Sequence, residues 1–296
     1  MSTKHIGGII TALITPFKDD RIDKRSYKGI VERQIRAGIH GLVPCGTTGE
    51  SATLGFDEHE MLIDYTVEVA DGRCFVIAGT GSNSTKEAVK LTSHAMKAGA
   101  DAALAITPYY NKPTQNGLYE HFRAIAEAVE IPLIPYNVPG RTGVNMLPDT
   151  IARLSEIKNI IGIKEATGSL QQVTETIKLC RKDFIVLSGD DFTALPSMAV
   201  GAKGVISVTS NIVPGQMVKM FRAYEKGDMD TANAINLKLW DLHSAMFMES
   251  NPIPVKAAAH LMRWISDEIR LPLTRMTGTN LGRLKAVMVR QGLIND

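Results

Sequence analysis

The chain has 296 residues, of which 44% are hydrophobic, and its 33 basic and 31 acidic side chains leave a net charge of +2. This length fits one large α/β barrel or two ordinary domains. Because charges of both signs are spread along the chain, we expect small-molecule chemistry and no binding of nucleic acid or of an anionic membrane.

The cysteines and the hydropathy favour a cytoplasmic protein. Cys45, Cys74 and Cys180 cannot all pair and show no C-x-x-C spacing, which favours reduced thiols. We expect Cys45 to be a small core residue rather than a nucleophile. No stretch approaches the ~18 apolar residues of a membrane span, and the apolar segment 6–14 is too short for one and lacks a signal-peptide cleavage site.

Short runs rich in β-forming residues alternate along the chain with segments of helical periodicity. The predicted strands are residues 8–15, 41–45, 75–79, 102–107, 132–137, 160–165, 185–188 and 204–208. The predicted helices between them include residues 26–37, 58–70, 86–98 and 119–129. Parallel strands need helical crossovers and become covered on both faces. The alternation therefore predicts an α/β fold, a (β/α)8 TIM barrel.

The pattern changes after residues 214–226, the predicted eighth helix. From Gly227 onward only helical segments occur, at 229–248, 254–266 and 280–291, with breaks at Asn251-Pro252 and Leu271-Pro272. We therefore predict a catalytic barrel over residues 1–226 and a C-terminal helical domain over residues 227–296.

Residues suited to catalysis follow the predicted strands, at the end of the barrel where active sites of this architecture lie. Their repeated occurrence at strand ends favours one shared site. They are Thr47 and Thr48 after the second strand, Tyr109 and Tyr110 after the fourth, Tyr136 and Arg141 at and after the end of the fifth, and Lys164 on the sixth.

Lys164 restricts the function most. On its strand, Gly162 and Lys164 share one face while Ile161 and Ile163 share the other. A buried, unpaired lysine tends to lose its proton, and the neutral amine is the nucleophile that forms a Schiff base with a carbonyl substrate. The alternative is a lysine that reaches solvent or pairs with Glu165. The residues at the neighbouring strand ends favour the Schiff base.

The turn Gly46-Thr47-Thr48-Gly49-Glu50 offers hydroxyls and free backbone N–H groups at a strand-to-helix junction. Such a turn suits a carboxylate, and it is not a P-loop because the Gly-Lys-Ser/Thr ending is missing. Thr47 is expected on the strand face of Val43 and Cys45, pointing toward the barrel axis.

Three other side chains have two interpretations each. Tyr136, on the strand face of Ile134, is either a proton carrier for the amine or a core aromatic residue with a satisfied hydroxyl. Arg141 is either a surface charge or a bidentate carboxylate clamp, and its place in a loop at the catalytic end favours the clamp. Tyr110 either packs against Tyr109 or reaches across a subunit interface.

Signals for a metal or a dinucleotide are weak. The 7 histidines include no H-E-x-x-H or similarly spaced pair, which argues against a metal-dependent aldolase. Gly79-Thr80-Gly81 begins like a dinucleotide fingerprint, but no third glycine or ribose-binding acid completes it. His59 is expected on the outer, solvated side of the second helix. We therefore expect no metal site.

Taken together, these motifs resemble the dihydrodipicolinate synthase and N-acetylneuraminate lyase superfamily of pyruvate-dependent class I aldolases. Residues 139–143, Pro-Gly-Arg-Thr-Gly, and 270–273, Arg-Leu-Pro-Leu, resemble the synthase branch, whose arginine in the first motif binds the carboxylate of aspartate semialdehyde. The resemblance runs over essentially the whole chain, and its motifs lie at residues 46–51, 108–111, 135–139, 162–165, 188–191 and 251–256.

The resemblance implies condensation of pyruvate with L-aspartate 4-semialdehyde to 4-hydroxy-tetrahydrodipicolinate, at the entry to lysine and diaminopimelate synthesis. It implies no cofactor beyond the covalent imine that pyruvate forms with Lys164. It also implies a proton relay of Tyr136, Thr47 and a Tyr110 from a neighbouring subunit. Thr47 and Thr48 would hold the pyruvate carboxylate and Arg141 the semialdehyde. The implied substrate-binding residues are Thr47, Thr48, Arg141, Gly189 and Ile206.

A homotetramer, built as a dimer of dimers, and a regulatory lysine site at a subunit interface are further implications of the resemblance. Phe56 replaces the histidine of several lysine-inhibited members, so the strength of feedback stays open. The positions that match the regulatory site are Ser51, Ala52, His59, Asn83, Glu87 and Tyr109.

Two other functions stay open at this stage. One is a sibling aldolase for 2-keto-3-deoxy sugar acids or 4-hydroxy-2-oxoglutarate, against which Arg141 argues. The other is a non-catalytic barrel that senses a small keto or amino acid. A sensor of this kind needs no imine, so the chemical competence of Lys164 separates the two classes.

Overall fold

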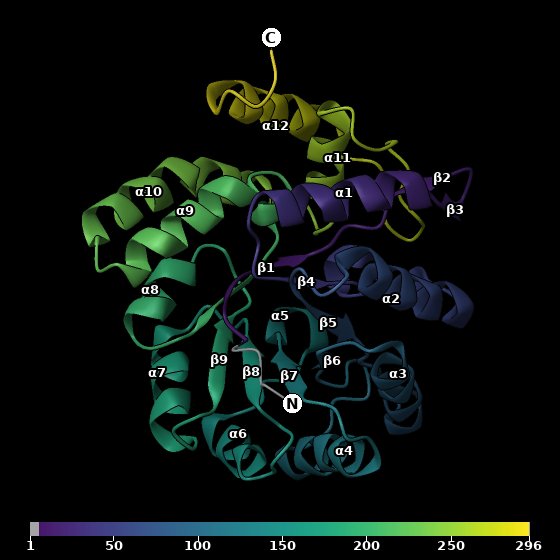
Figure 1. Ribbon diagram of the computed structural model, residues 1–296, viewed down its shortest axis with the longest axis vertical. Helices are drawn as coiled ribbons and strands as arrows, with labels where there is room; N and C mark the ends of the chain where they lie inside the picture. The colour runs from purple at the N-terminus through teal and green to yellow at the C-terminus, as the bar shows by residue number, and fades with distance from the viewer. Residues whose placement is uncertain (1–5, 296) are drawn as a thin grey trace.

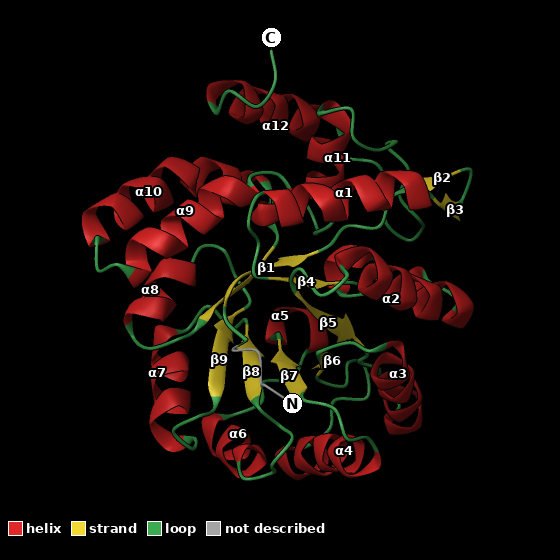
Figure 2. Cartoon of the chain, viewed as in Figure 1, coloured by secondary structure: helices red, strands yellow, loops and turns green. Residues whose placement is uncertain are grey.

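A closed barrel of parallel strands forms the centre of the protein. The computed structural model describes residues 6–295 (Figure 1). Around the barrel the strands follow the order β1-β10-β9-β8-β7-β6-β5-β4 (Figure 2), which confirms the predicted (β/α)8 barrel. Their bounds are β1 Gly8–Ala12, β4 Gly41–Val43, β5 Phe75–Gly79, β6 Ala102–Ile106, β7 Leu133–Asn137, β8 Gly162–Glu165, β9 Ile185–Ser188 and β10 Gly204–Ser207.

Helices surround the barrel and carry the chain from the end of one strand to the start of the next (Figure 1). Some begin where a side-chain oxygen accepts a backbone N–H of the first turn, as Ser84 does for Glu87. The bounds are α1 Lys24–Arg36, α2 Phe56–Ala70, α3 Thr85–Ala98, α4 Gln115–Ala128, α5 Pro139–Thr142, α6 Pro148–Ser155, α7 Leu170–Leu179, α8 Ala194–Ala199 and α9 Pro214–Glu225. Short 3-10 turns lie at η1 Thr47–Gly49, η2 Ser51–Thr53 and η3 Thr209–Asn211.

Successive side chains of the strands enter two different hydrophobic clusters. Ile9 and Val205 belong to a cluster that also contains residues of the surrounding helices, whereas Ile10 and Ile206 belong to a cluster built from strand and loop residues alone. Because side chains alternate across a strand, the second cluster fills the inside of the barrel. Any polar side chain on that inner face is therefore surrounded by apolar groups.

An antiparallel hairpin between β1 and α1 was not predicted. It consists of β2 Phe17–Lys18 and β3 Arg21–Ile22, joined through Asp19 and Asp20. Both aspartates have positive φ, 53° and 56°, which suits a two-residue hairpin turn. The predicted first strand, residues 8–15, is too long, because β1 ends at Ala12.

The C-terminal helices α10 Met229–Ala245, α11 Ile253–Leu261 and α12 Gly278–Arg290 lie on one side of the barrel, outside α1 and α9 (Figure 1). Helix α10 packs along α9. The predicted helix 254–266 is too long, since α11 ends at Leu261 and Arg263 has a φ of 60°. None of the described helices is long and apolar enough to cross a membrane. The division into residues 1–226 and 227–296 stays a prediction.

Candidate active site

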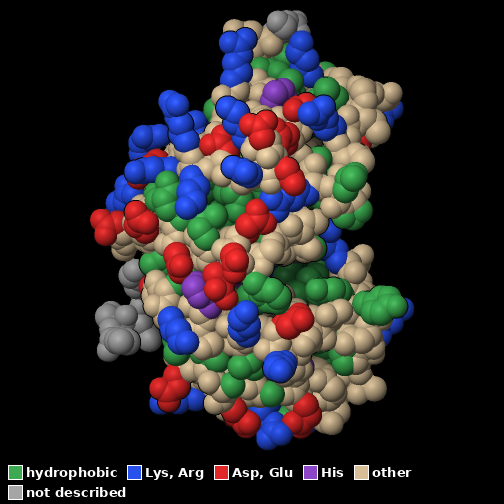
Figure 3. All heavy atoms as spheres, turned by 90° about the vertical axis from the view of Figure 1, so that its right-hand side faces the viewer, with side chains coloured by type: hydrophobic (Ala, Val, Ile, Leu, Met, Phe, Trp, Pro, Cys, Tyr) green, Lys and Arg blue, Asp and Glu red, His purple; other side chains and the backbone are tan. Residues whose placement is uncertain are grey.

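A cavity of about 440 Å³ lies where β4, β5, β6 and β7 end, at the predicted catalytic end of the barrel. Figure 3 shows a recess in the face that carries α2 and α3, with acidic and basic side chains interspersed around it. Thr47, Tyr109, Tyr136 and Arg141 line the cavity. The structure therefore brings four of the predicted site residues to one place.

Lys164 lies just behind this wall, in register with Tyr136 on the adjacent strand. Its Nζ is 4.0 Å from the centroid of the Tyr136 ring, and the residue is 6% exposed. Burial lowers the pKa of Lys164 from 10.5 to about 7, Asp191 opposes this shift, and Arg141 adds to it. An amine in this environment is substantially neutral near pH 7.

The alternative interpretation of Lys164 was wrong. The side chain is buried rather than extended into solvent, and the Glu165 carboxylate is engaged elsewhere. Glu165 accepts hydrogen bonds from the Thr167 backbone at 2.7 Å, from Asn137 at 3.0 Å and from Gln172 at 3.2 Å. Among residues 6–295, Lys164 forms no ion pair within 4.0 Å.

Gly189 and Ile206 complete the surroundings of the lysine. A Cβ at Gly189 would lie 3.0 Å from Lys164 Cε and 2.7 Å from Ala166 Cβ, so the position has no room for a side chain. Ile206 is fully buried in the cluster that fills the barrel. Gly189 thus limits the space beside the lysine side chain, and Ile206 is part of the apolar filling of the barrel.

Tyr136 is 7% exposed and belongs to the inner cluster with Ile134, as the strand parity predicted. Burial raises the pKa of the Tyr136 hydroxyl to about 12, while the charge of Arg141 and the nearby Thr47 side chain work in the opposite direction. The hydroxyl therefore keeps its proton near neutral pH and is placed to pass it along to Thr47.

The predicted geometry of the Thr47 turn was partly wrong. Strand β4 ends at Val43, and Cys45 has a positive φ of 54°, so the strand parity does not continue to Thr47. Val43 belongs to the inner cluster, whereas Cys45 belongs to the outer one, where its thiol donates to the His59 carbonyl. Burial raises the pKa of Cys45, and its predicted role as a core residue is confirmed. Thr47 reaches the cavity through the 3-10 turn η1.

Arg141 lies in α5, directly after β7, and its guanidinium donates to the Asn251 carbonyl at 2.9 Å. The residue is exposed and lines the cavity, so its other N–H groups are accessible from that side. Thr48 is buried behind the wall, and its hydroxyl accepts a hydrogen bond from the Asn251 side chain at 2.9 Å. Sequence reasoning had given Asn251 no role.

Tyr110 contributes nothing to the cavity of its own chain. It is 90% exposed, has a positive φ of 70°, and is not part of the cavity wall, whereas Tyr109 is 39% exposed and lines it. Within the described chain the two rings form no aromatic pair, so the packed-pair interpretation was wrong.

The residues of the implied regulatory site lie in and near another part of the same cavity. Its walls there include Ser51, Ala52, His59, Glu87 and Tyr109. Asn83 does not line the cavity, and its carbonyl accepts from the Asn111 side chain at 2.9 Å.

Two side chains in this part of the cavity, His59 and Phe56, bear on the expected regulatory site. The expected solvated position of His59 was wrong: it is 6% exposed, and burial, aided by His94, lowers its pKa to about 4. Phe56 is 46% exposed, and Lys90 Nζ lies 4.5 Å from its ring centroid. At position 56 this chain therefore has an aromatic ring that cannot titrate, where several lysine-inhibited members of the family have a histidine.

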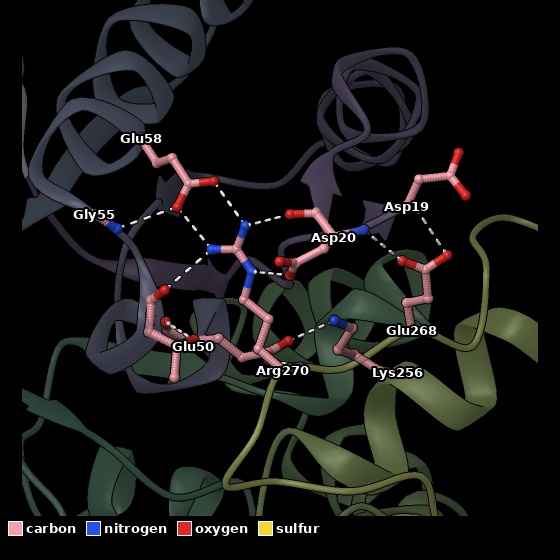
Figure 4. Close-up of polar contacts among 9 residues, drawn as sticks. Asp19, Asp20, Glu50, Gly55, Glu58, Lys256, Glu268 and Arg270 are labelled. Carbon is pink, nitrogen blue, oxygen red and sulfur yellow. Dashed lines mark hydrogen bonds and ion pairs between the residues drawn. The ribbon is translucent and has the colours of Figure 1, made fainter.

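An ionic network that is buried at Glu50 and Lys256 connects the threonine turn to the C-terminal helices (Figure 4). Lys256 on α11 donates to Glu50, and these side chains are 3% and 1% exposed. The other Glu50 oxygen accepts the Arg270 backbone N–H at 3.1 Å. The Arg270 guanidinium in turn makes two 2.7 Å hydrogen bonds to Glu58 and one of 3.0 Å to Asp20. The sequence did not predict this network, because its members lie far apart along the chain.

Among the residues that the structure describes, no group of three or more His, Cys, Asp or Glu side chains is placed to hold a metal ion. The arrangement found instead is a buried, readily deprotonated lysine beside a protonated tyrosine, at the carboxyl ends of barrel strands. This arrangement suits a barrel enzyme that acts through a lysine imine.

The sequence matches the Dihydrodipicolinate synthetase family over residues 5–291, and the chain belongs to this family. The 4-hydroxy-tetrahydrodipicolinate synthase of Syntrophus aciditrophicus is 55% identical over 287 residues, which cover 97% of this chain and 99% of the relative. The predicted synthase activity, a lyase activity of lysine and diaminopimelate biosynthesis, is thereby confirmed. The sibling aldolase and the non-catalytic sensor have no support.

Solved structures agree with this assignment. The chloride-inhibited dihydrodipicolinate synthase of Acinetobacter baumannii, complexed with pyruvate, has a TM-score of 0.96 and 49% identity, covering 98% of this chain and 100% of that chain. The enzyme of Cyanidioschyzon merolae with lysine bound has a TM-score of 0.95 and 40% identity, covering 98% of this chain and 99% of that chain.

Proposed function

We propose that this chain condenses pyruvate with L-aspartate 4-semialdehyde through an imine on Lys164. The observation that carries the proposal is the buried amine of Lys164, whose pKa burial lowers to about 7. The neutral amine attacks the keto carbon of pyruvate, the carbinolamine loses water, and loss of a methyl proton gives an enamine.

The enamine carbon then bonds to the aldehyde carbon of the semialdehyde, whose oxygen takes up a proton. The amino group that came with the semialdehyde attacks the imine carbon, closes the ring and releases the Lys164 amine. In each of these reaction steps, side chains at the site or the substrates supply or accept the proton. The reaction therefore needs no cofactor beyond the covalent imine with pyruvate.

Tyr136 and Thr47 act as the proton relay in this proposal. Two observations support it: both side chains line the cavity, and the pKa of Tyr136 is raised to about 12. A phenol that keeps its proton can donate it to the leaving water and recover it later. Tyr110 of a neighbouring subunit extends the relay. Its 90% exposure in the single chain leaves its hydroxyl available to a partner.

Thr47 and Thr48 bind the pyruvate carboxylate, and Arg141 binds the carboxylate of the semialdehyde. The position of Arg141 at the cavity wall supports this role, because a guanidinium can bind a carboxylate with two parallel hydrogen bonds. Gly189 leaves space beside the lysine, and Ile206 provides an apolar surface under the imine.

The protein acts in the cytoplasm as a homotetramer, a dimer of dimers, and lysine binds at Ser51, Ala52, His59, Asn83, Glu87 and Tyr109. The position of most of these residues around one cavity and the similarity to a structure with lysine bound support the regulatory site. Phe56, with Lys90 stacked on its ring, leads us to expect weaker inhibition than a histidine there would give.

Borohydride reduction in the presence of pyruvate tests the central proposal. We expect one three-carbon unit per chain, located on Lys164 by peptide mapping, and none in Lys164→Ala. Lys256 is a matched internal control, because it is equally buried but is ion-paired with Glu50. Labelling of Lys112 or Lys203 instead of Lys164, or no labelling, would refute the imine mechanism.

A further inference from the structure

Asn251 joins two of the proposed substrate-binding residues. Its side-chain Nδ2 donates to the Thr48 hydroxyl at 2.9 Å, and its backbone carbonyl accepts from the Arg141 guanidinium at 2.9 Å. Asn251 is 5% exposed and lines the cavity together with Arg141. It therefore touches one of the side chains assigned to each of the two substrate carboxylates.

The direction of the hydrogen bond to Thr48 decides what that hydroxyl can do. A threonine hydroxyl has one proton to donate and two lone pairs that accept. The amide nitrogen of Asn251 can only donate, so the Thr48 oxygen accepts and its own proton stays free. Within the described chain, Asn251 is the one hydrogen-bond partner of this buried hydroxyl. A free proton is what a carboxylate oxygen requires.

We propose that Asn251 is a positioning residue, which keeps the Thr48 hydroxyl as a donor to the pyruvate carboxylate and holds Arg141 beside it. This inference rests on the roles proposed above for Thr48 and Arg141. Asn251 acts through these two side chains and not on the reacting atoms.

The Asn251–Thr48 contact sits in a rigid frame. Asn251 lies just before α11, which carries Lys256, and Thr48 lies in the turn that ends at Glu50. The buried ion pair between Lys256 and Glu50 fixes the helix and the turn on either side of the contact. A change of the Asn251 side chain is therefore expected to act locally, on the Thr48 hydroxyl.

Asn251→Asp is the sharpest test, because it replaces an N–H donor by an acceptor of the same size. The carboxylate would accept a hydrogen bond from the Thr48 hydroxyl and so compete with the pyruvate carboxylate for its one proton. We therefore expect the KM for pyruvate to rise about ten- to a hundred-fold. Asn251→Ala removes the donor without adding a competitor, so a rise of about two- to ten-fold is expected. The KM for the semialdehyde should change less, since both variants keep the backbone carbonyl that holds Arg141.

A pH series separates this role from a loss of stability. Burial raises the pKa of a carboxyl introduced at this 5% exposed position above the ordinary value near 3.9. Protonation of this carboxyl restores a donor, so the ratio of variant to parent pyruvate KM should fall as the pH is lowered from about 8 to about 5.5. Asn236→Asp is the matched control, because Asn236 is also a buried amide of the C-terminal helices, 7% exposed, and lies outside the cavity wall. Its pyruvate KM is expected to equal that of the parent.

A double-mutant cycle with Thr48→Val decides the matter even where Asn251→Asp does not fold. If Asn251 acts through Thr48, Asn251→Ala has almost no further effect on pyruvate KM in the Thr48→Val background. Additive effects in the cycle, or an unchanged pyruvate KM in folded Asn251→Asp, would overturn this inference. A parent enzyme that shows no borohydride label on Lys164 would instead overturn the proposed mechanism, and the inference with it.

Discussion

Tyr136 on β7 is paired in register with Lys164 on β8, and the lysine Nζ lies 4.0 Å from the centroid of the tyrosine ring. The ring face attracts an ammonium, whereas burial disfavours it. Burial dominates, because the pKa of Lys164 is lowered to about 7. The pair therefore combines an amine that is neutral at physiological pH with a phenol that still carries its proton.

The first prediction is the pH dependence of imine formation. At limiting pyruvate, the rate of borohydride-trapped labelling should follow the neutral fraction of Lys164, rising with pH and levelling off above about pH 7 to 8. The rate is measured by mass spectrometry of the reduced protein. A rate that keeps rising toward pH 10 would mean that the amine has the pKa of an ordinary exposed lysine.

A second prediction is that Lys164→Met stabilises the protein. The unfolded lysine holds its proton up to about pH 10.5, while the folded one loses it near pH 7, so the parent gains stability as the pH rises between these values. The variant lacks this dependence. Its free energy of unfolding should exceed that of the parent by on the order of 4 kcal/mol at pH 7, and the difference should shrink toward pH 10. Urea denaturation at several pH values measures it, and a difference independent of pH would contradict the explanation.

A third prediction separates the ring of Tyr136 from its hydroxyl. Tyr136→Phe keeps the ring beside Lys164 and removes the relay, so kcat should fall about 10²- to 10⁴-fold. The midpoint of the labelling profile should stay near that of the parent, because the surroundings of the amine are preserved. A variant that keeps parental kcat would show that protons reach the imine by another route.

The sequence was sufficient for the barrel and for much of the site because both follow short-range rules. Alternation along β7 and β8 places Tyr136 and Lys164 on the inner face, as predicted. The same rule failed at Thr47, because β4 is only three residues long and Cys45 turns the backbone. Periodicity predicts the direction of a side chain only as far as the strand continues.

Long-range packing explains what the sequence did not reveal. His59 was expected in solvent, but its burial depends on what α2 packs against, which no local pattern of α2 contains. Glu50 and Lys256 are separated by 206 positions, and each alone is an ordinary charged residue. Only the closed fold shows that the two are buried together.

The fourth prediction concerns this ion pair. Lys256→Met leaves the Glu50 carboxylate buried without its cation, which should cost about 3 to 5 kcal/mol of unfolding free energy. Adding Glu50→Gln removes the uncompensated charge and keeps an acceptor for the Arg270 backbone N–H, so the double variant should be more stable than Lys256→Met alone. Urea denaturation of both single variants and the double variant measures the coupling.

An exposed ion pair provides the control for that cycle. Arg275 and Asp267 lie 3.0 Å apart with side chains 67% and 44% exposed. Arg275→Met is expected to cost less than about 1 kcal/mol, because solvent screens such pairs. If Lys256→Met costs no more than Arg275→Met, the buried pair does not hold α11 to the threonine turn.

The last prediction tests whether Tyr110 acts in the site of a neighbouring subunit. A Lys164→Ala chain and a Tyr110→Phe chain are each expected to be inactive or nearly so. If two subunits exchange this tyrosine, a hybrid pair contains one doubly defective site and one site with both groups intact. Random equal mixing makes half of the pairs hybrid, so about a quarter of all sites should regain activity after dissociation and reassociation.

The exposure of Tyr110, 90% in the single chain, is the observation behind this expectation. A mixture of Lys164→Ala with Tyr136→Phe is the matched control, because both residues lie side by side on adjacent strands of one chain. Its hybrids contain no intact site and should stay inactive. Mixtures of the Tyr110→Phe chain that reassociate, as checked by mass, yet show only the summed activity of their parents would mean that Tyr110 does not serve a neighbouring site.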